Sequence, residues 1–249
     1  MLRRLAPVVL VALLLAQFPG VAVAVGELRP DLGMAPLTDL RVTTIDSGQR
    51  QLRFSATIVN VGQGPFEITA TRSSQDAPFQ VVQQVPLADG TRTPVTLPVG
   101  LVYGGDGHDH WHVRDLESYQ IVRQDHEDTV GVSAKGGFCF YDTSAYRRSL
   151  PGAARSTVYP KSGCGKRDSL VVSMGLSVGW ADIYAWTLPD QFIDITNLAD
   201  GRYRLVATAD AQGMFVEGSR ANNSTWVDIA LVSYQNGTAV RILGHGPSA

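Results

Sequence analysis

The sequence feature that most constrains the fold is an alternation of apolar and polar residues with a period of two. In segment 52–62, LRFSATIVNVG, one face of a β-strand would carry Leu52, Phe54, Ala56, Ile58 and Asn60. Similar segments rich in β-branched and aromatic residues lie at 79–85, 119–122, 203–210 and 225–234. Turn signals such as NVGQG, LADGT and QNGT separate such segments. The pattern predicts an all-β protein, an antiparallel β-sandwich-like single domain with long loops.

The first 24 residues have the features of a signal peptide. Arg3 and Arg4 precede an apolar run at 8–16, and small residues at 22–24 predict cleavage after Ala24. The alternative is a retained membrane anchor, but the run is shorter than the roughly 20 residues that a spanning helix needs. We therefore expect no stable membrane anchor, and a mature domain of residues 25–249 that is secreted to an extracellular or periplasmic compartment.

Net charge and cysteine content further limit the classes of protein to which the chain can belong. The formal net charge of −2 is spread without long runs of one sign, which argues against a nucleic-acid partner. The only two cysteines, Cys139 and Cys164, are expected to form a disulfide in an exported chain, and the alternative is a pair of buried free thiols. This bond would pin the polar segment 141–174, which is predicted to be an extended loop.

The motif GHDHWHV at 107–113 contains three of the five histidines in the chain. Residues at i, i+2 and i+4 of a strand point to one face, so His108, His110 and His112 would present three imidazoles in a row. Such a row can enclose one divalent ion, and imidazole suits copper, zinc, iron and nickel alike. The alternative is a solvated polar face beside a glycine-rich turn.

Four separated motifs occur in the order found in one known family. They are HDHWH, KGGFCFYD, GLSVGWADIYAWTLPDQFIDIT and GRYRLVATAD…EGSRANNS, and the similarity begins near RPDL at 29–32. The chain resembles the lysyl oxidase family, and most closely its prokaryotic members. It departs from animal members at Trp180, which replaces a cysteine, and at Met174, which replaces a glutamine. These changes affect scaffold and pocket walls, so they bear on the substrate more than on the reaction.

The resemblance implies a secreted copper amine oxidase built on a β-sandwich. Its cofactor would be lysyl tyrosylquinone, made by the protein from Lys135 and Tyr184, with Asp182 as the catalytic base. The Cu(II) ligands implied by the resemblance are His108, His110 and His112. Asp182 and Tyr184 are two residues apart, so on a strand both would face the same side.

The activity implied by the resemblance is oxidation of primary amines to aldehydes with O2, with release of H2O2 and ammonia. The amine would be peptidyl lysine or a small primary amine, and the sequence does not specify which. Three other functions compete with this one. They are a non-catalytic secreted copper-binding β-domain, a zinc hydrolase that activates a metal-bound water, and an extracellular adhesion module.

The motif EGSRANNS at 217–224 collects oxygen-bearing side chains of the kind that favour Ca2+. By similarity to the family, the ligands of a calcium site would be Asp31, Leu32 through its carbonyl, Glu217, Asn222 and Asn223. Ser219 stands where animal members have an aspartate, and the lost negative charge should weaken binding. The alternative is a hydrogen-bonded loop that ties down the N-terminal segment.

Overall fold

The structure is a computed structural model that describes residues 26–104, 109–133 and 135–249. The predicted signal peptide, 1–24, lies outside the described residues. The regular secondary structure of the described chain consists almost entirely of antiparallel strands, which confirms the predicted all-β fold class. Within the described ranges, no helix is long and apolar enough to cross a membrane.

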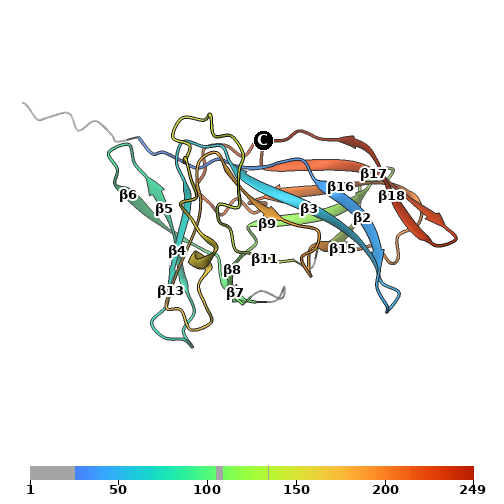
Figure 1. Ribbon diagram of the computed structural model, residues 1–249, viewed down its shortest axis with the longest axis horizontal. Helices are drawn as coiled ribbons and strands as arrows, with labels where there is room; N and C mark the ends of the chain where they lie inside the picture. The colour runs from blue at the N-terminus through green and yellow to red at the C-terminus, as the bar shows by residue number, and fades with distance from the viewer. Residues whose placement is uncertain (1–25, 105–108, 134) are drawn as a thin grey trace, which may run out of the picture.

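Two large sheets form one end of the molecule (Figure 1). The six-stranded sheet contains β1 (Leu32–Met34), β2 (Thr38–Thr44), β3 (Arg50–Asn60), β12 (Ser144–Ala145), β14 (Trp180–Tyr184) and β15 (Phe192–Asp194). The five-stranded sheet contains β9 (Glu117–Arg123), β10 (Thr129–Val132), β16 (Gly201–Ala209), β17 (Ser224–Tyr234) and β18 (Gly237–His245). Phe54 of β3 meets Tyr119 of β9 edge to face, with ring centroids 5.0 Å apart, so the core lies between these two sheets.

Two smaller sheets complete the fold. The four-stranded sheet contains β4 (Phe66–Thr71), β5 (Gln80–Pro86), β6 (Arg92–Leu97) and β13 (Val171–Leu176), and it forms the other end of the molecule in Figure 1. The three-stranded sheet contains β7 (Leu101–Tyr103), β8 (Trp111–Arg114) and β11 (Gly137–Phe138). The single 3-10 turn described is η1 (Lys161–Cys164).

The face predicted for segment 52–62 is the buried face of β3. Its alternate residues are all fully buried, including the polar residue at its end: Leu52, Phe54, Ala56, Ile58 and Asn60. The Asn60 amide donates to the carbonyls of Gly64 and Leu176 and accepts from the backbone N–H of Asp31 and Gly62. Its polar atoms are therefore satisfied, and they tie β3 to the N-terminal segment and to β13.

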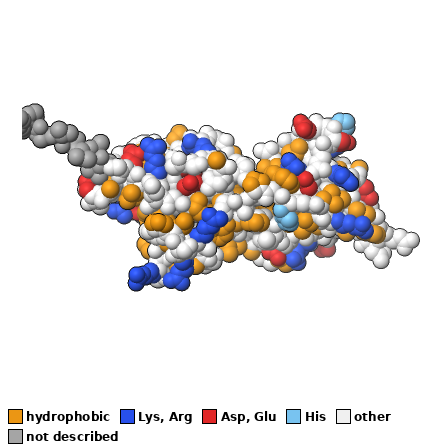
Figure 2. Space-filling view, turned by 90° about the horizontal axis from the view of Figure 1, so that it is seen from above, with side chains coloured by type: hydrophobic (Ala, Val, Ile, Leu, Met, Phe, Trp, Pro, Cys, Tyr) orange, Lys and Arg blue, Asp and Glu red, His pale blue; other side chains and the backbone are white. Residues whose placement is uncertain are grey.

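The predicted loop 141–174 is largely irregular, but its last residues belong to β13, which pairs with β4. The buried carboxylate of Asp142 organises this segment, because it accepts hydrogen bonds from the backbone of Val158, Tyr159 and Ser177. The Cys139–Cys164 disulfide is formed, as predicted. Figure 2 shows acidic and basic side chains interspersed over the face in view.

Candidate active site

Two of the three predicted imidazoles lie side by side at the start of β8. The rings of His110 and His112 are both buried, with centroids 4.6 Å apart and planes inclined by 45°. His108 lies outside the described residues. Across the described ranges, no cluster of three His, Cys, Asp or Glu side chains has metal-binding geometry. The adjacent pair supplies two donors of the type that Cu(II) accepts.

Pairing of β8 with β11 brings the segment that contains Lys135 towards the histidines. Val113 is opposite Phe138 and Arg114 is opposite Gly137. A Cβ atom on Gly137 would lie only 2.9 Å from the Cβ of His112, so glycine at this position allows the close approach of the two strands.

The amine of Lys135 lies beside the ring of Tyr184. Lys135 is 6% exposed, and its Nζ is 5.4 Å from the Tyr184 ring centroid and 5.2 Å from that of Phe138. The Phe138 and Tyr184 rings contact each other edge to face at 5.0 Å. Residues separated by 49 positions in sequence thus lie side by side in the fold.

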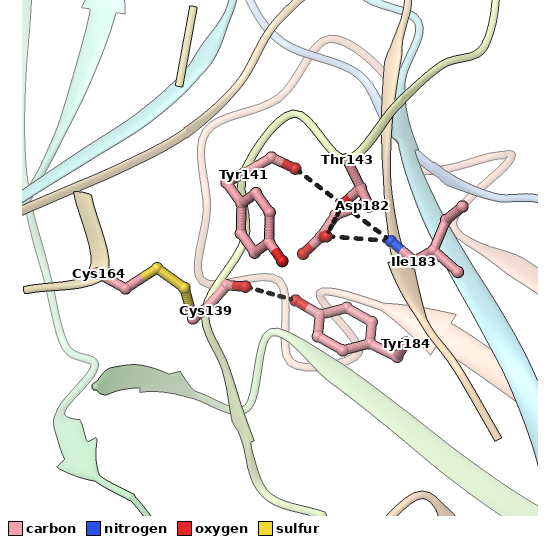
Figure 3. Close-up of a disulfide and its surroundings, with 7 residues drawn as sticks. All are labelled: Cys139, Tyr141, Thr143, Cys164, Asp182, Ile183 and Tyr184. Carbon is pink, nitrogen blue, oxygen red and sulfur yellow. Dashed lines mark hydrogen bonds between the residues drawn. A yellow bond between two sulfur atoms is a disulfide. The ribbon is translucent and has the colours of Figure 1, made fainter. Parts of the chain in front are cut away.

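Asp182 and Tyr184 lie on the inward face of β14, and the intervening Ile183 is exposed. One carboxylate oxygen of Asp182 accepts hydrogen bonds from the Thr143 hydroxyl and from the Ile183 backbone N–H (Figure 3). Burial raises the pKa of Asp182 to about 6, against the lowering effect of the Thr143 hydrogen bond. This carboxyl group can therefore take up and release a proton near neutral pH.

The two histidines, Asp182 and Tyr184 line one pocket of about 150 Å³. Its lining residues are His110, His112, Cys139, Tyr141, Lys161, Asp182, Ile183, Tyr184, Ala185 and Leu188. The Tyr184 hydroxyl donates to the carbonyl of Cys139, 3.3 Å away, so the disulfide segment forms one wall of the pocket (Figure 3). Burial raises the pKa of Tyr184 well above its ordinary value, and the neighbouring Asp182 charge raises it further.

A second buried acid, Glu117, was missed by the sequence reasoning. Glu117 is 2% exposed and accepts a hydrogen bond of 2.7 Å from the Tyr119 hydroxyl. The available signal was its position, because it alternates with Tyr119 and Ile121 on the buried face of β9. An acid among inward-facing apolar residues is unusual and marks a candidate functional group.

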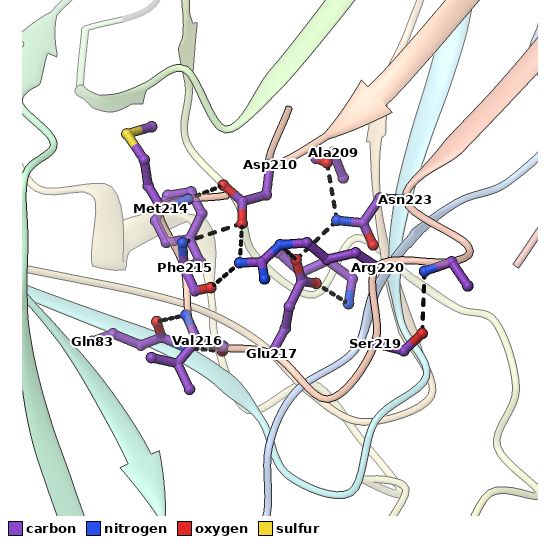
Figure 4. A network of polar contacts seen from close by, with 12 residues as sticks. Gln83, Ala209, Asp210, Met214, Phe215, Val216, Glu217, Ser219, Arg220 and Asn223 are labelled. Atoms are coloured by element: carbon purple, nitrogen blue, oxygen red, sulfur yellow. Dashed lines mark hydrogen bonds and ion pairs between the residues drawn. The ribbon is translucent and has the colours of Figure 1, made fainter. Parts of the chain in front are cut away.

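The proposed calcium residues also come together, at the junction of β1 with the 217–223 loop. Glu217 accepts hydrogen bonds from the backbone N–H of Leu32 and from the amide of Asn223, and Arg220 contacts it at 3.2 Å (Figure 4). The predicted alternative, a loop that holds the N-terminal segment, is thus a real feature of the fold.

Three buried oxygens in the same cluster have no hydrogen-bond partner among the described residues. They are the side-chain oxygens Asp31 Oδ1, Asn222 Oδ1 and Asn223 Oδ1. Unsatisfied carboxylate and amide oxygens that share a region are the donor set of a hard cation, so these residues fit Ca2+. Arg220 already supplies positive charge to Glu217, however, and would compete with the ion.

Together, these features define an antiparallel all-β protein with a small pocket in which imidazole, carboxylate and phenol groups meet beside a lysine. The family model described as lysyl oxidase matches residues 104–240, a span that includes the histidines, Lys135, Asp182 and Tyr184. The chain belongs to the lysyl oxidase family. No curated protein matches this chain.

Proposed function

We propose that this protein is a copper-dependent amine oxidase that converts primary amines to aldehydes with O2, releasing H2O2 and ammonia. The observation that carries the proposal is the distance of 5.4 Å between the Lys135 amine and the Tyr184 ring, in a region that also contains two imidazoles and Asp182. Family membership supports the same reaction class.

The residues present fit the two groups that this activity requires. His110 and His112, with His108, would hold Cu(II), and Lys135 and Tyr184 would form lysyl tyrosylquinone. Copper supplies the oxygen chemistry that oxidises the tyrosine ring, and the finished cofactor supplies an electrophilic carbonyl for the substrate amine. The Phe138 ring contacts both the Lys135 amine and the Tyr184 ring.

Asp182 is the proposed catalytic base. It lines the same pocket as Tyr184 and would remove the proton from the carbon that carries the substrate nitrogen. The hydrogen bonds from Thr143 and from the Ile183 backbone fix the position of one oxygen and thereby orient the carboxylate. A pKa of about 6 leaves most of the group ionised at neutral pH.

The pocket favours a slender substrate. Its volume of about 150 Å³ is about five times the ~30 Å³ share of one water molecule, enough for the end of an unbranched alkyl amine. The apolar walls formed by Ala185 and Leu188 would exclude water from such a chain. Peptidyl lysine and small primary amines both meet this requirement.

We further propose that residues 1–24 are removed and that the domain 25–249 acts outside the cytoplasm, in an extracellular or periplasmic space. The apolar run and the small residues before position 25 support cleavage. The disulfide supports an oxidising compartment.

The activity is tested with copper-loaded protein, phenylhydrazine and a primary amine. The wild-type protein should form a coloured hydrazine adduct and release peroxide from the amine. Lys135→Ala and Tyr184→Phe should do neither, although both should still bind copper. If either variant is labelled, the cofactor assignment is wrong. If the wild-type protein binds copper but is not labelled, the chain is instead a non-catalytic copper-binding domain.

A further inference from the structure

One wall of the active-site pocket is formed by the 185–191 turn, the segment that connects β14 to β15. It contributes Ala185 and Leu188 to the pocket lining. Backbone hydrogen bonds within the turn run from Leu188 to the carbonyl of Ala185 and from Gln191 to that of Leu188. Pro189 has no backbone N–H to donate. A turn with so few bonds of its own needs contacts from outside to define its shape.

The guanidinium group of Arg53, on β3, supplies those contacts. Its Nη1 donates to the carbonyls of Trp186 and Leu188, each 2.9 Å away, and its Nη2 donates to the carbonyl of Pro189 at 3.1 Å. Its Nε donates to Gln51 Oε1 at 3.0 Å, which fixes the plane of the group. A guanidinium presents its donors in a rigid planar arrangement, so it can hold several acceptors in set positions.

The sheet in turn holds Arg53. Strand β3 pairs with β1, β2, β14 and β15, and Phe192 of β15 is directly opposite Arg53. The Arg53 guanidinium carbon lies 5.3 Å from the Phe192 ring centroid. The carbonyls that it holds belong to Leu188 itself and to residues on either side of Leu188. A shift of this arginine would therefore move the Leu188 side chain, which lines the pocket.

We propose that Arg53 is a positioning residue that fixes the 185–191 turn and thereby makes the pocket selective for unbranched alkyl amines. This inference rests on the proposed function. Arg53 acts through the backbone of the turn on Leu188, whose side chain limits the width of the pocket. A single methylene group in a hydrophobic pocket changes kcat/KM by about 10- to 200-fold, so a small displacement of this wall has a measurable effect on substrate choice.

Arg50, on the same strand, provides a matched control. Its Nη2 donates to the carbonyls of Ile195, Thr196 and Leu198, at 3.0, 2.7 and 2.6 Å. Both arginines are half-buried, and each holds three backbone carbonyls of a segment next to β15. No residue of 195–198 is among those that line the pocket. Loss of Arg50 should therefore affect stability in the same way but leave substrate choice unchanged.

The test compares the oxidation of two isomers, pentylamine and isopentylamine, by copper-loaded wild type, Arg53→Lys, Arg53→Gln and Arg50→Lys. The quantity measured is the ratio of kcat/KM for the unbranched amine to kcat/KM for the branched one. This ratio does not depend on the fraction of active protein, so partial unfolding or incomplete cofactor formation leaves it unchanged. Lysine keeps the positive charge but lacks the planar arrangement of donors. Backbone hydrogen exchange of the copper-free proteins follows the turns themselves.

We expect both Arg53 variants to lower the ratio at least about fivefold and to exchange faster at 185–191. Arg50→Lys should keep the wild-type ratio and exchange faster only at 195–198. If one Arg53 variant does not fold, the other still decides the outcome.

Two results would overturn the proposal. They are a wild-type ratio in a folded Arg53 variant, and an equal fall of the ratio in Arg50→Lys. Unchanged exchange at 185–191 in the Arg53 variants would also overturn it, whatever the activity. If wild type oxidises neither amine, the amine oxidase function itself is wrong, and the effect on substrate choice falls with it.

Discussion

Asp182 and Glu117 are two carboxyl groups in one buried region, and their hydrogen bonds distinguish them. Asp182 accepts from a hydroxyl and from a backbone N–H, whereas Glu117, among the described residues, accepts only from the Tyr119 hydroxyl. Burial raises the pKa of both, to about 6 for Asp182 and to about 8 for Glu117. Environments that give two carboxyl groups different pKa values suit them to different proton-transfer steps.

Replacement of Asp182 by asparagine should abolish most turnover but spare the cofactor. We expect kcat to fall by about 10²- to 10⁴-fold, because the proposed base is lost, while phenylhydrazine still labels the protein. In wild type, kcat/KM should fall as the pH drops below about 6, since the protonated carboxyl cannot accept a proton. The exposed Asp125→Asn serves as control. Wild-type turnover in Asp182→Asn would exclude this residue as the base.

At the scale of the element, β11 is a strand of two residues that pairs with β8 and lies two residues after Lys135. Its register with β8 sets Gly137 against the side chain of His112. The preceding Gly136 has no atom within 4 Å of the position that a Cβ would take. The two adjacent glycines therefore form a matched pair for mutation.

Gly137→Ala should weaken copper binding, whereas Gly136→Ala should not. The added methyl group would lie 2.9 Å from the His112 Cβ and 3.1 Å from a Val102 methyl, so β8 must shift. Overpacking of this kind costs about 1–3 kcal/mol, which corresponds to an increase of roughly 5- to 150-fold in Kd if the strain falls on the metal site. Calorimetric titration of copper-free protein measures this. Equal Kd values for both variants would contradict the role given to β11.

Removal of the disulfide should destabilise the protein and loosen the pocket wall. The closed loop of 25 residues corresponds to about 3.5 kcal/mol in the loop-entropy account. Denaturant unfolding of Cys139→Ser, Cys164→Ser and the double variant should give about the same loss for all three, because each removes the same bond. A clearly larger loss in the double variant would mean that the two side chains contribute independently of the bond.

Long strands were predictable from the sequence, and short ones were not. The predicted strands at 52–62, 119–122, 203–210 and 225–234 correspond to β3, β9, β16 and β17, because each carries its own alternation. The strands β11 and β12 contain two residues each and exist only through pairing with distant strands. The end of the predicted loop 141–174 became part of β13 for the same reason.

The candidate site was predictable only where a motif identified it. The histidines, Lys135, Asp182 and Tyr184 lie within recognisable segments, but Thr143 and Glu117 do not. Their importance depends on which strands pair, since Thr143 reaches Asp182 across 39 residues of sequence. Such contacts follow from tertiary structure, which local sequence patterns do not specify.

At the scale of the whole molecule, the N-terminal segment is attached to the 217–223 loop that precedes β17. The backbone of Leu32 donates to Glu217, and Met34 donates to the carbonyl of Asn222. A bound ion at this junction would stabilise the complete fold, because it would hold together segments almost 200 residues apart.

Calcium should therefore raise the thermal midpoint of the protein. At about ten times its Kd, a ligand that binds only the folded state contributes about 1.4 kcal/mol, or about 3–6 °C for a chain of this size. Ser219→Asp should increase the shift by restoring a negative charge, and Asn222→Ala should decrease it. Scanning calorimetry with calcium and with a chelator measures these effects. Equal midpoints under both conditions would favour a loop held by hydrogen bonds alone.

The central claim is that Lys135 and Tyr184 become covalently joined beside the histidine pair. The most direct measurement is the mass of the peptides that contain these residues, after denaturation and digestion of protein produced with copper. The account predicts one joined species in wild type and separate peptides in Lys135→Ala and in protein produced without copper. Separate, unmodified peptides from copper-loaded wild type would contradict it.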